Sequence, residues 1–155
     1  MLFRSLIIAG IGEELKKIED YVALHGLEKK VRITGTLSKE SLNMLMIGGD
    51  FLLFPSRHET FGLIAQEALC TGLPVITSNT CATDELIDAE MGIKVDPDDV
   101  DAISHAMVTM ANNLDRYDGE KIRSKVVSRF GLKAFGEKLQ DYYGELIGQC
   151  AELQE

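Results

Sequence analysis

The chain has 155 residues, of which 45% are hydrophobic, so it is long enough to bury one substantial core and too short for two ordinary domains. Its 25 acidic residues outnumber its 16 lysines and arginines and give a formal net charge of -9. Because the basic residues are interleaved with acids and form no cluster, this charge argues against a nucleic-acid partner.

Cysteine usage and the apolar stretches indicate the compartment. The three cysteines, Cys70, Cys81 and Cys150, are odd in number and lack the paired spacing of a zinc site, which favours reduced thiols over a disulfide framework. No apolar stretch approaches the roughly 20 residues that cross a bilayer. The segment MLFRSLIIAG also lacks the small-residue cleavage pattern of a signal peptide. We therefore expect a cytoplasmic protein.

Apolar runs bounded by glycine or proline alternate with segments of helical periodicity. The first run covers residues 2–9 and closes at Gly10 and Gly12, which predicts a buried strand followed by a turn. Further strands are predicted at 31–34, 51–54, 75–78 and 92–95. Helices are predicted from 13 to about 24, after the candidate N-cap Ser38, at 63–69, around 85–87, from about 98 to 112, and as one or two segments between 120 and 149.

This alternation determines the expected fold. Helices of about ten residues or more between apolar strands indicate βαβ crossovers and a parallel sheet covered on both faces. We therefore expect one α/β domain over residues 1–155, Rossmann-like, with helices on both faces of the sheet. In such sheets ligands bind beyond the carboxyl ends of the strands, where loops lead into helix N-termini.

The segment from Phe54 to Ser78, FPSRHETFGLIAQEALCTGLPVITS, carries the candidate chemistry. A strand leads through a polar loop into a helix that opens near Gly62, and the free amides of a helix N-terminus attract anions such as phosphate. Glu59 precedes this helix and Glu67 lies within it. At a rise of about 1.5 Å per residue their backbones are of order 10 Å apart, so the two carboxylates would meet different ends of an elongated ligand. A sugar and a ribose flanking a pyrophosphate match that span.

This segment resembles the E-x7-E signature of group 1 retaining glycosyltransferases, in the domain that binds the nucleotide-sugar donor. The matching positions are Glu59, Phe61-Gly62-Leu63, Glu67-Ala68-Leu69, Gly72 and Pro74-Val75. The glycine turn at 10–12, the strand at 31–35 and the strand with its Pro-Ser end at 50–56 resemble the same family. A long pattern in a strand-turn-helix context is more specific than a glycine pair alone.

The resemblance implies a role for each residue of the signature. Glu59 would be the catalytic residue that contacts the donor sugar through its hydroxyls, on the side where the glycosidic bond breaks. Glu67 would accept hydrogen bonds from the ribose hydroxyls. The backbone amides of Phe61, Gly62 and Leu63 would hold the diphosphate and stabilise its developing charge as it leaves.

Two further places complete the implied donor site. Gly10 and Gly12 would leave room for nucleotide or acceptor near the cleft between the two halves of the enzyme, and Ile33 and Thr34 would border the base. No metal or other cofactor is implied, because the helix terminus and basic side chains can replace a divalent cation. The implied donor is a UDP-, GDP- or ADP-linked hexose, used in polysaccharide or glycolipid biosynthesis.

The sequence also departs from the family that it resembles. Full-length relatives have an upstream acceptor domain and, opening the donor domain, a strand and helix whose basic pair neutralises the diphosphate. The resemblance therefore predicts a sheet without its central first strand, with unpaired backbone groups at the vacancy, and a chain that is inactive without the N-terminal domain. A homo-oligomer through the incomplete sheet and peripheral membrane association of the full-length enzyme are both compatible with this interpretation.

Several residues have a plainer interpretation. We interpret His58 and Arg57 as exposed loop residues, Cys70 as core, and the segment 132–146 as a packed structural helix. The acids at 96–101 lack the spacing of a calcium loop and favour the following helix N-terminus. Three functions stay open: a donor-binding domain of a retaining glycosyltransferase, a nucleotide or nucleotide-sugar binding module without turnover, and an interaction fragment that has lost ligand binding.

Overall fold

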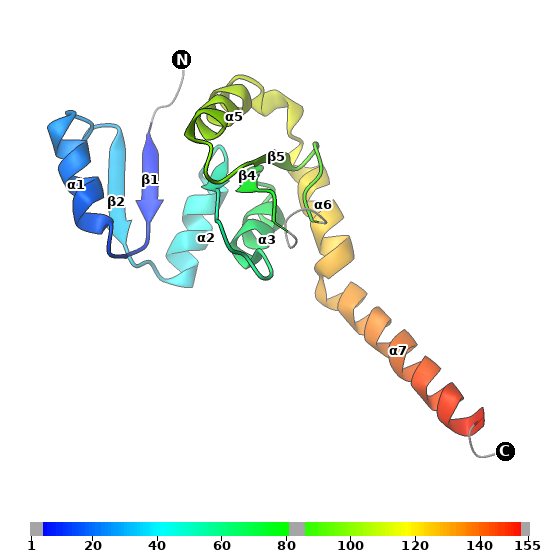
Figure 1. Ribbon diagram of the computed structural model, residues 1–155. Helices are drawn as coiled ribbons and strands as arrows, with labels where there is room; N and C mark the ends of the chain where they lie inside the picture. The colour runs from blue at the N-terminus through cyan, green and yellow to red at the C-terminus, as the bar shows by residue number, and fades with distance from the viewer. Residues whose placement is uncertain (1–4, 81–85, 153–155) are drawn as a thin grey trace.

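The computed structural model describes residues 5–80 and 86–152, in which strands and helices alternate over most of the length (Figure 1). The strands are β1 (Leu6–Ala9), β2 (Val31–Gly35), β3 (Leu52–Phe54), β4 (Val75–Ser78) and β5 (Gly92–Val95). The helices are α1 (Leu15–Leu24), α2 (Lys39–Ile47), α3 (Leu63–Cys70), α5 (Val100–Asn112), α6 (Gly119–Phe130) and α7 (Leu132–Glu152), with a 3-10 turn at Leu114–Arg116. These elements confirm the α/β, Rossmann-like prediction. Of the helix predicted around 85–87, residue 85 lies outside the described residues, and Leu86 and Ile87 are not helical.

The strands form two separate parallel sheets. One contains β1 and β2, and the other has the order β3-β4-β5. Figure 1 shows the first sheet, in blue, standing apart from the second, with β1 on its inner side. Within the described ranges no strand joins the two sheets. In the part of the chain that the structure describes, β1 and β3 each have one neighbouring strand.

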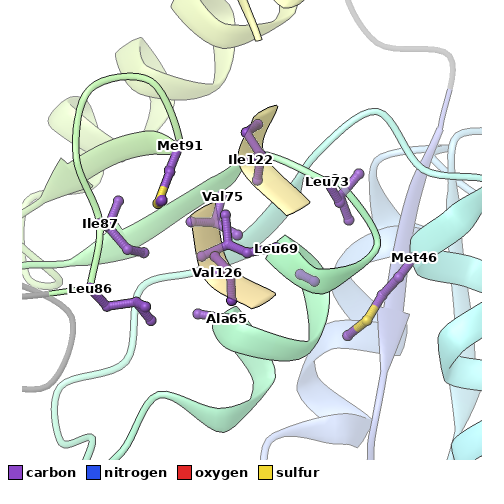
Figure 2. Close-up of a cluster of buried hydrophobic side chains, with 11 residues drawn as sticks. Met46, Ala65, Leu69, Leu73, Val75, Leu86, Ile87, Met91, Ile122 and Val126 are labelled. Atoms are coloured by element: carbon purple, nitrogen blue, oxygen red, sulfur yellow. The ribbon is translucent and has the colours of Figure 1, made fainter. Parts of the chain in front are cut away.

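The core is built on the two faces of β4, whose four residues are all buried. Val75 faces a cluster with α3 and α6, in which Leu69, Ile122 and Val126 are almost completely buried (Figure 2). Ile76 faces the opposite side and packs in a second cluster with α5. The two faces are both covered because successive side chains of a strand point in opposite directions.

Helix starts follow the capping residues that the sequence contains. The Ser38 side chain accepts a hydrogen bond of 3.2 Å from the Ser41 amide at the start of α2, as predicted. Asp99 caps α5 by accepting a hydrogen bond of 2.8 Å from the Ala102 amide. The prediction that the acids near residue 99 serve the next helix N-terminus is therefore confirmed. Among the described helices, none is both long and apolar enough to cross a membrane.

Three burial predictions are wrong. Burial of β1 is predicted, but Leu6 and Ile7 remain 37% and 40% exposed, because within the described residues β1 has a neighbouring strand, β2, on one edge only. Helix α7 extends away from the body of the molecule (Figure 1), so Leu132 and Phe135 are largely exposed instead of packed. Cys70, at the last turn of α3, is exposed instead of lying in the core.

A substitution at Gly72 would test how closely α3 packs against α6. Its φ is +84°, and a Cβ atom there would lie 2.7 Å from the Gly119 carbonyl oxygen at the start of α6. Gly26 has a similar φ of +62° but open space around it. We expect Gly26→Ala to cost about 1 kcal/mol of unfolding free energy through backbone strain alone. Gly72→Ala adds the clash and should cost roughly 3 kcal/mol. Urea unfolding of both variants measures the difference, and equal losses would contradict the packing described here.

Candidate functional site

The loop between β3 and α3 is held by the carboxyl end of β4. The buried Ser78 hydroxyl donates a hydrogen bond to the Ser56 carbonyl oxygen, and the Ser56 hydroxyl donates one of 2.9 Å to the His58 carbonyl oxygen. The loop that carries Glu59 is therefore anchored to the most buried strand of the chain.

A surface ion pair fixes the same loop from another side. The Arg57 Nε lies 2.6 Å from the Asp98 Oδ1 in the connection between β5 and α5. Both side chains are largely exposed, so the pair contributes at most about 1 kcal/mol. Arg57 is thus an exposed loop arginine, as interpreted from the sequence, and its guanidinium group is paired with the Asp98 carboxylate.

Gly62 forms the junction from loop to helix. It has φ +62° and ψ +34°, a left-handed conformation that favours glycine, and it is the N-cap residue of α3. Its carbonyl accepts the first helical hydrogen bond from the Gln66 amide at 2.9 Å, while the Gln66 side chain donates to the Phe61 carbonyl at 2.6 Å. The side chains of Phe61 and Leu63 point outward and are 70% and 65% exposed. The backbone at this helix start is therefore fixed, and its apolar flanks are open to a ligand or partner.

The Glu59 carboxylate accepts hydrogen bonds in the loop just before the N-terminus of α3. Its Oε1 accepts hydrogen bonds from the amides of Thr60 and Phe61, at 3.0 and 3.2 Å. The amides of Gly62 and Phe61 hold the pKa of Glu59 below its usual range. Of the three amides that the sequence suggested for an anion, that of Phe61 is thus already bonded to Glu59, and no side chain caps α3 itself.

Glu67 lies further along α3 and faces the start of α2. Its Oε1 is 3.4 Å from the Lys39 Nζ, and the carboxylate remains 43% exposed. Lys39 directly follows the N-cap Ser38, so the start of α2 places the Lys39 ammonium group next to Glu67. The pair is accessible, and a hydroxyl group of a ligand could replace the lysine as a hydrogen-bond donor.

The other predicted residues lie on the smaller sheet. Gly10 follows β1, has φ +130° and donates its amide to the Gly35 carbonyl at 2.8 Å, and no atom would meet a Cβ at Gly10 or Gly12. Thr34 donates its hydroxyl to the Ile8 carbonyl at 3.4 Å, and Ile33 is half-buried in β2. In Figure 1 the turn after β1 and the loop before α3 lie toward the same, lower side of the molecule. No strand of the described chain bridges these two parts of the predicted site.

Three residues of this region were missed from the sequence. Lys39, Gln66 and Ser78 each hold a predicted site residue or its loop. A signal existed only for Ser78, as a polar residue at the carboxyl end of an apolar strand. Lys39 and Gln66 look like ordinary solvent-facing helix residues until the fold brings them to their partners.

Neither of two hollows on the surface coincides with the site. One, of about 350 Å³, lies beside α2 and is lined by Arg32 and Met44 among others; the other, of about 280 Å³, lies near Tyr117 and the far end of α3. Neither is lined by Glu59 or Glu67. Within residues 5–80 and 86–152 no group of three potential metal ligands occurs. The candidate site is therefore an open loop-and-helix surface, and the expected absence of a metal stays a prediction.

Comparison with solved structures defines the class of fold. Sucrose-phosphate synthase from Thermosynechococcus elongatus matches 94% of this chain and 39% of its own, with a TM-score of 0.78 and 25% identity. The Anabaena protein Alr3699/HepE, solved with UDP and glucose, matches 91% of this chain and 40% of its own, with a TM-score of 0.77 and 19% identity. At that identity the second likeness shows the fold alone, which is that of one Rossmann-like half of a two-domain glycosyltransferase.

Sequence comparison identifies the family. The model of the glycosyl transferases group 1 family matches residues 4–119, and the chain belongs to this family. An uncharacterized glycosyltransferase of Methanocaldococcus jannaschii is 35% identical over 64% of this chain and 26% of its own length. A GDP-mannose:cellobiosyl-diphosphopolyprenol alpha-mannosyltransferase of Xanthomonas oryzae pv. oryzae is 31% identical over 92% of this chain and 39% of its own. The chain therefore spans between about a quarter and two fifths of the length of these relatives.

The hydrogen bonds that Glu59 accepts from the Thr60 and Phe61 amides predict a pH dependence of stability. Because folding lowers the pKa of Glu59, its contribution is fully present above the unfolded-state pKa of about 4.3 and is lost as the pH falls through the lower folded-state pKa. Glu59→Gln should therefore lose less unfolding free energy than the parent chain when the pH is lowered from neutral to about 3. Glu28→Gln, at an exposed turn before β2, is the control and should behave like the parent. Urea unfolding at both pH values measures the effect, and identical pH profiles for all three chains would refute a stabilising role of these hydrogen bonds.

Proposed function

We propose that this chain is the nucleotide-sugar donor-binding part of a retaining glycosyltransferase that transfers a hexose from a nucleoside-diphosphate sugar. The observation that carries the proposal is the anchored junction at Gly62, where a helix N-terminus stands between two accessible carboxylates, Glu59 and Glu67. Membership of the glycosyltransferase family supports the reaction type. The E-x7-E spacing of the two glutamates supports the retaining, hexose-transferring assignment.

Donor binding begins with an exchange of anions at α3. The diphosphate takes over the amides around Phe61, Gly62 and Leu63, and the displaced Glu59 carboxylate turns toward the hydroxyls of the sugar. The exchange is favourable because a diphosphate carries more charge than one carboxylate at the positive end of the helix dipole. Glu59 is then the catalytic residue, beside the glycosidic bond that breaks, while the amides stabilise the leaving diphosphate.

Ribose recognition falls to Glu67. The two ribose hydroxyls replace the Lys39 ammonium group as donors to the Glu67 carboxylate, which is a strong acceptor. Lys39 remains close enough to offset part of the negative charge of the ligand. On the smaller sheet, Gly10 and Gly12 leave space for nucleotide or acceptor, and Ile33 and Thr34 border the base.

Turnover requires more polypeptide than this chain contains. The relatives are more than twice as long as the region they share with it, and the described site offers the diphosphate few free cations, since Arg57 is paired with Asp98. We propose that an acceptor domain completes the enzyme and that neither a metal nor another cofactor takes part. The exposed free thiol of Cys70 supports a cytoplasmic location, where thiols stay reduced.

Relatives suggest the range of donors and acceptors to test. The Xanthomonas relative is named for GDP-mannose and a lipid-linked acceptor, and the Anabaena structure holds UDP and glucose. We therefore propose a UDP-, GDP- or ADP-linked hexose as donor and an acceptor in polysaccharide or glycolipid synthesis. Full-length enzyme would meet a lipid-linked acceptor by peripheral association with the membrane.

Glu67→Ala tests the ribose contact. Loss of a charged hydrogen-bond partner costs about 1.5–3 kcal/mol, so we expect the variant to bind its nucleoside diphosphate roughly 10- to 100-fold more weakly. The parent chain should prefer the ribonucleotide over its 2′-deoxy form, and the variant should lose this preference. Calorimetric titration with UDP, GDP and ADP and with their 2′-deoxy forms measures both effects. Glu137→Ala on α7 is the control, and an unchanged dissociation constant for Glu67→Ala would contradict the assignment.

Donor turnover separates the enzyme from a simple binding module. We expect the chain alone to bind a nucleoside-diphosphate hexose and to release no nucleoside diphosphate, because the acceptor side is absent. Fusion of the chain to the unmatched part of the Methanocaldococcus relative should restore release, and Glu59→Gln in the fusion should abolish it. Binding without turnover in every form would favour the module. Absence of binding to all three nucleotides would leave only the interaction fragment.

A further inference from the structure

The peptide unit between Phe61 and Gly62 is held at its carbonyl end by a side chain of α3. The Phe61 carbonyl oxygen accepts a hydrogen bond of 2.6 Å from the side-chain amide of Gln66. In a trans peptide the carbonyl and the N–H point in opposite directions, and no cis peptide bond occurs among the described residues. The Gln66 bond therefore turns the N–H of Gly62 away from Gln66.

The N–H at the other end of this peptide unit faces Glu59. The Gly62 amide is the largest cause of the lowered pKa of the Glu59 carboxyl group, ahead of the Phe61 amide. Glu59 also accepts hydrogen bonds from the Thr60 and Phe61 amides in the same loop. One peptide unit thus connects an uncharged donor on α3 with the carboxylate of the loop.

Gly62 itself does not determine which way the peptide unit faces. A half-turn of the unit changes mainly the ψ angle of Phe61 and the φ angle of Gly62, and glycine adopts positive and negative φ about equally readily. The φ of +62° at Gly62 is therefore one of two accessible choices. The Phe61 side chain is 70% exposed, so its packing restrains the unit little. The orientation depends instead on the groups bonded at the two ends of the unit.

Gln66 has a fixed position from which to supply this restraint. Its backbone amide donates a hydrogen bond of 2.9 Å to the Gly62 carbonyl oxygen, so the first turn of α3 fixes the place where the side chain starts. The helix is in turn anchored by its buried residues Ala65 and Leu69. Because only the NH2 group of a glutamine side chain can donate, the Phe61 carbonyl also selects one orientation of the Gln66 amide.

The two ends of the peptide unit respond differently to an incoming anion. In the proposed function a diphosphate displaces the Glu59 carboxylate, so the Gly62 amide changes its partner. Gln66 is uncharged and bonds the opposite end of the unit, so its hydrogen bond persists through the exchange. Without this bond the unit would be free to turn and present the Phe61 carbonyl oxygen to the anion, which would repel it.

We propose that Gln66 is a positioning residue that holds the peptide unit of Phe61 and Gly62 with its N–H directed at the diphosphate of the donor. The role toward the diphosphate rests on the proposed function, whereas the hold on the peptide unit does not. Gln66 acts through the Gly62 amide and needs no contact of its own with the sugar or the phosphates.

NMR on the full chain without ligand tests the hold on the peptide unit. The two scalar couplings between the Gly62 amide proton and its α-protons depend on φ and so report the orientation. Gln66→Met keeps the side-chain length but removes the donor, so these couplings should move toward an average over both orientations, and the pKa of Glu59 should rise toward its ordinary range. Glu59→Ala removes the bond at the other end and should leave the couplings unchanged. Gln140→Met, at an exposed position on α7, is the matched control and should change neither quantity.

Nucleotide binding tests the role toward the diphosphate. Gln66→Met should bind the nucleoside diphosphate that the parent chain prefers roughly tenfold more weakly, because the Gly62 amide is no longer held toward the phosphates. The preference for the ribonucleotide over its 2′-deoxy form should persist, since Glu67 is unchanged. A general disturbance of α3 would reduce both, because Glu67 lies on the same helix. Calorimetric titration of the parent, Gln66→Met and Gln140→Met with UDP, GDP and ADP and their 2′-deoxy forms measures both quantities.

Several results would overturn the proposal. The hold on the peptide unit is refuted if Gln66→Met leaves either the Gly62 couplings or the pKa of Glu59 as in the parent, or if Glu59→Ala changes the couplings. The role toward the diphosphate is refuted if Gln66→Met binds as tightly as the parent, or if it loses affinity and the ribose preference together. A parent chain that binds none of the three nucleotides would refute the proposed function instead, and the NMR results would still decide whether Gln66 holds the peptide unit.

Discussion

Burial of β4 on both faces is the constraint on which the rest of the structure depends. Val75 and Ile76 point to opposite sides and each enters its own apolar cluster, and complete burial of such a side chain contributes about 1.5–3 kcal/mol. The same strand pairs with β3 and β5, so it fixes the direction of the larger sheet. Its last residue, Ser78, then holds Ser56 and with it the loop of Glu59. The position of the candidate site is therefore set by the least exposed strand of the chain.

In the function proposed above, the start of α3 after Gly62 makes this fixed position an anion site. A carboxylate from the preceding loop already satisfies the amides of Thr60 and Phe61. An exposed carboxylate at a helix N-terminus contributes only about 0.3–1 kcal/mol, so a ligand with more negative charge can displace it. The arrangement keeps the amides oriented without a ligand, and it couples arrival of an anion to movement of Glu59.

Sequence reasoning located most of the elements because their ends depend on short-range signals. Proline, glycine and capping residues mark where strands and helices end, and Ser38 and Asp99 cap the helices predicted for them. Burial of β1 and α7 was predicted wrongly, because a strand or helix is buried only if other elements cover it, and its own pattern does not show whether they do. The pair of Lys39 with Glu67 was missed for the same reason, since the fold alone brings α2 to α3.

The divided sheet also has a consequence for affinity. Gly10 and Thr34 lie on the β1-β2 sheet or next to it, whereas Glu59 and Glu67 lie in the loop and helix that follow β3 of the larger sheet. No described strand connects the two sheets and fixes the distance between these two pairs of residues. A ligand that touches both must therefore fix their relative position when it binds, at a cost in conformational entropy that lowers its affinity.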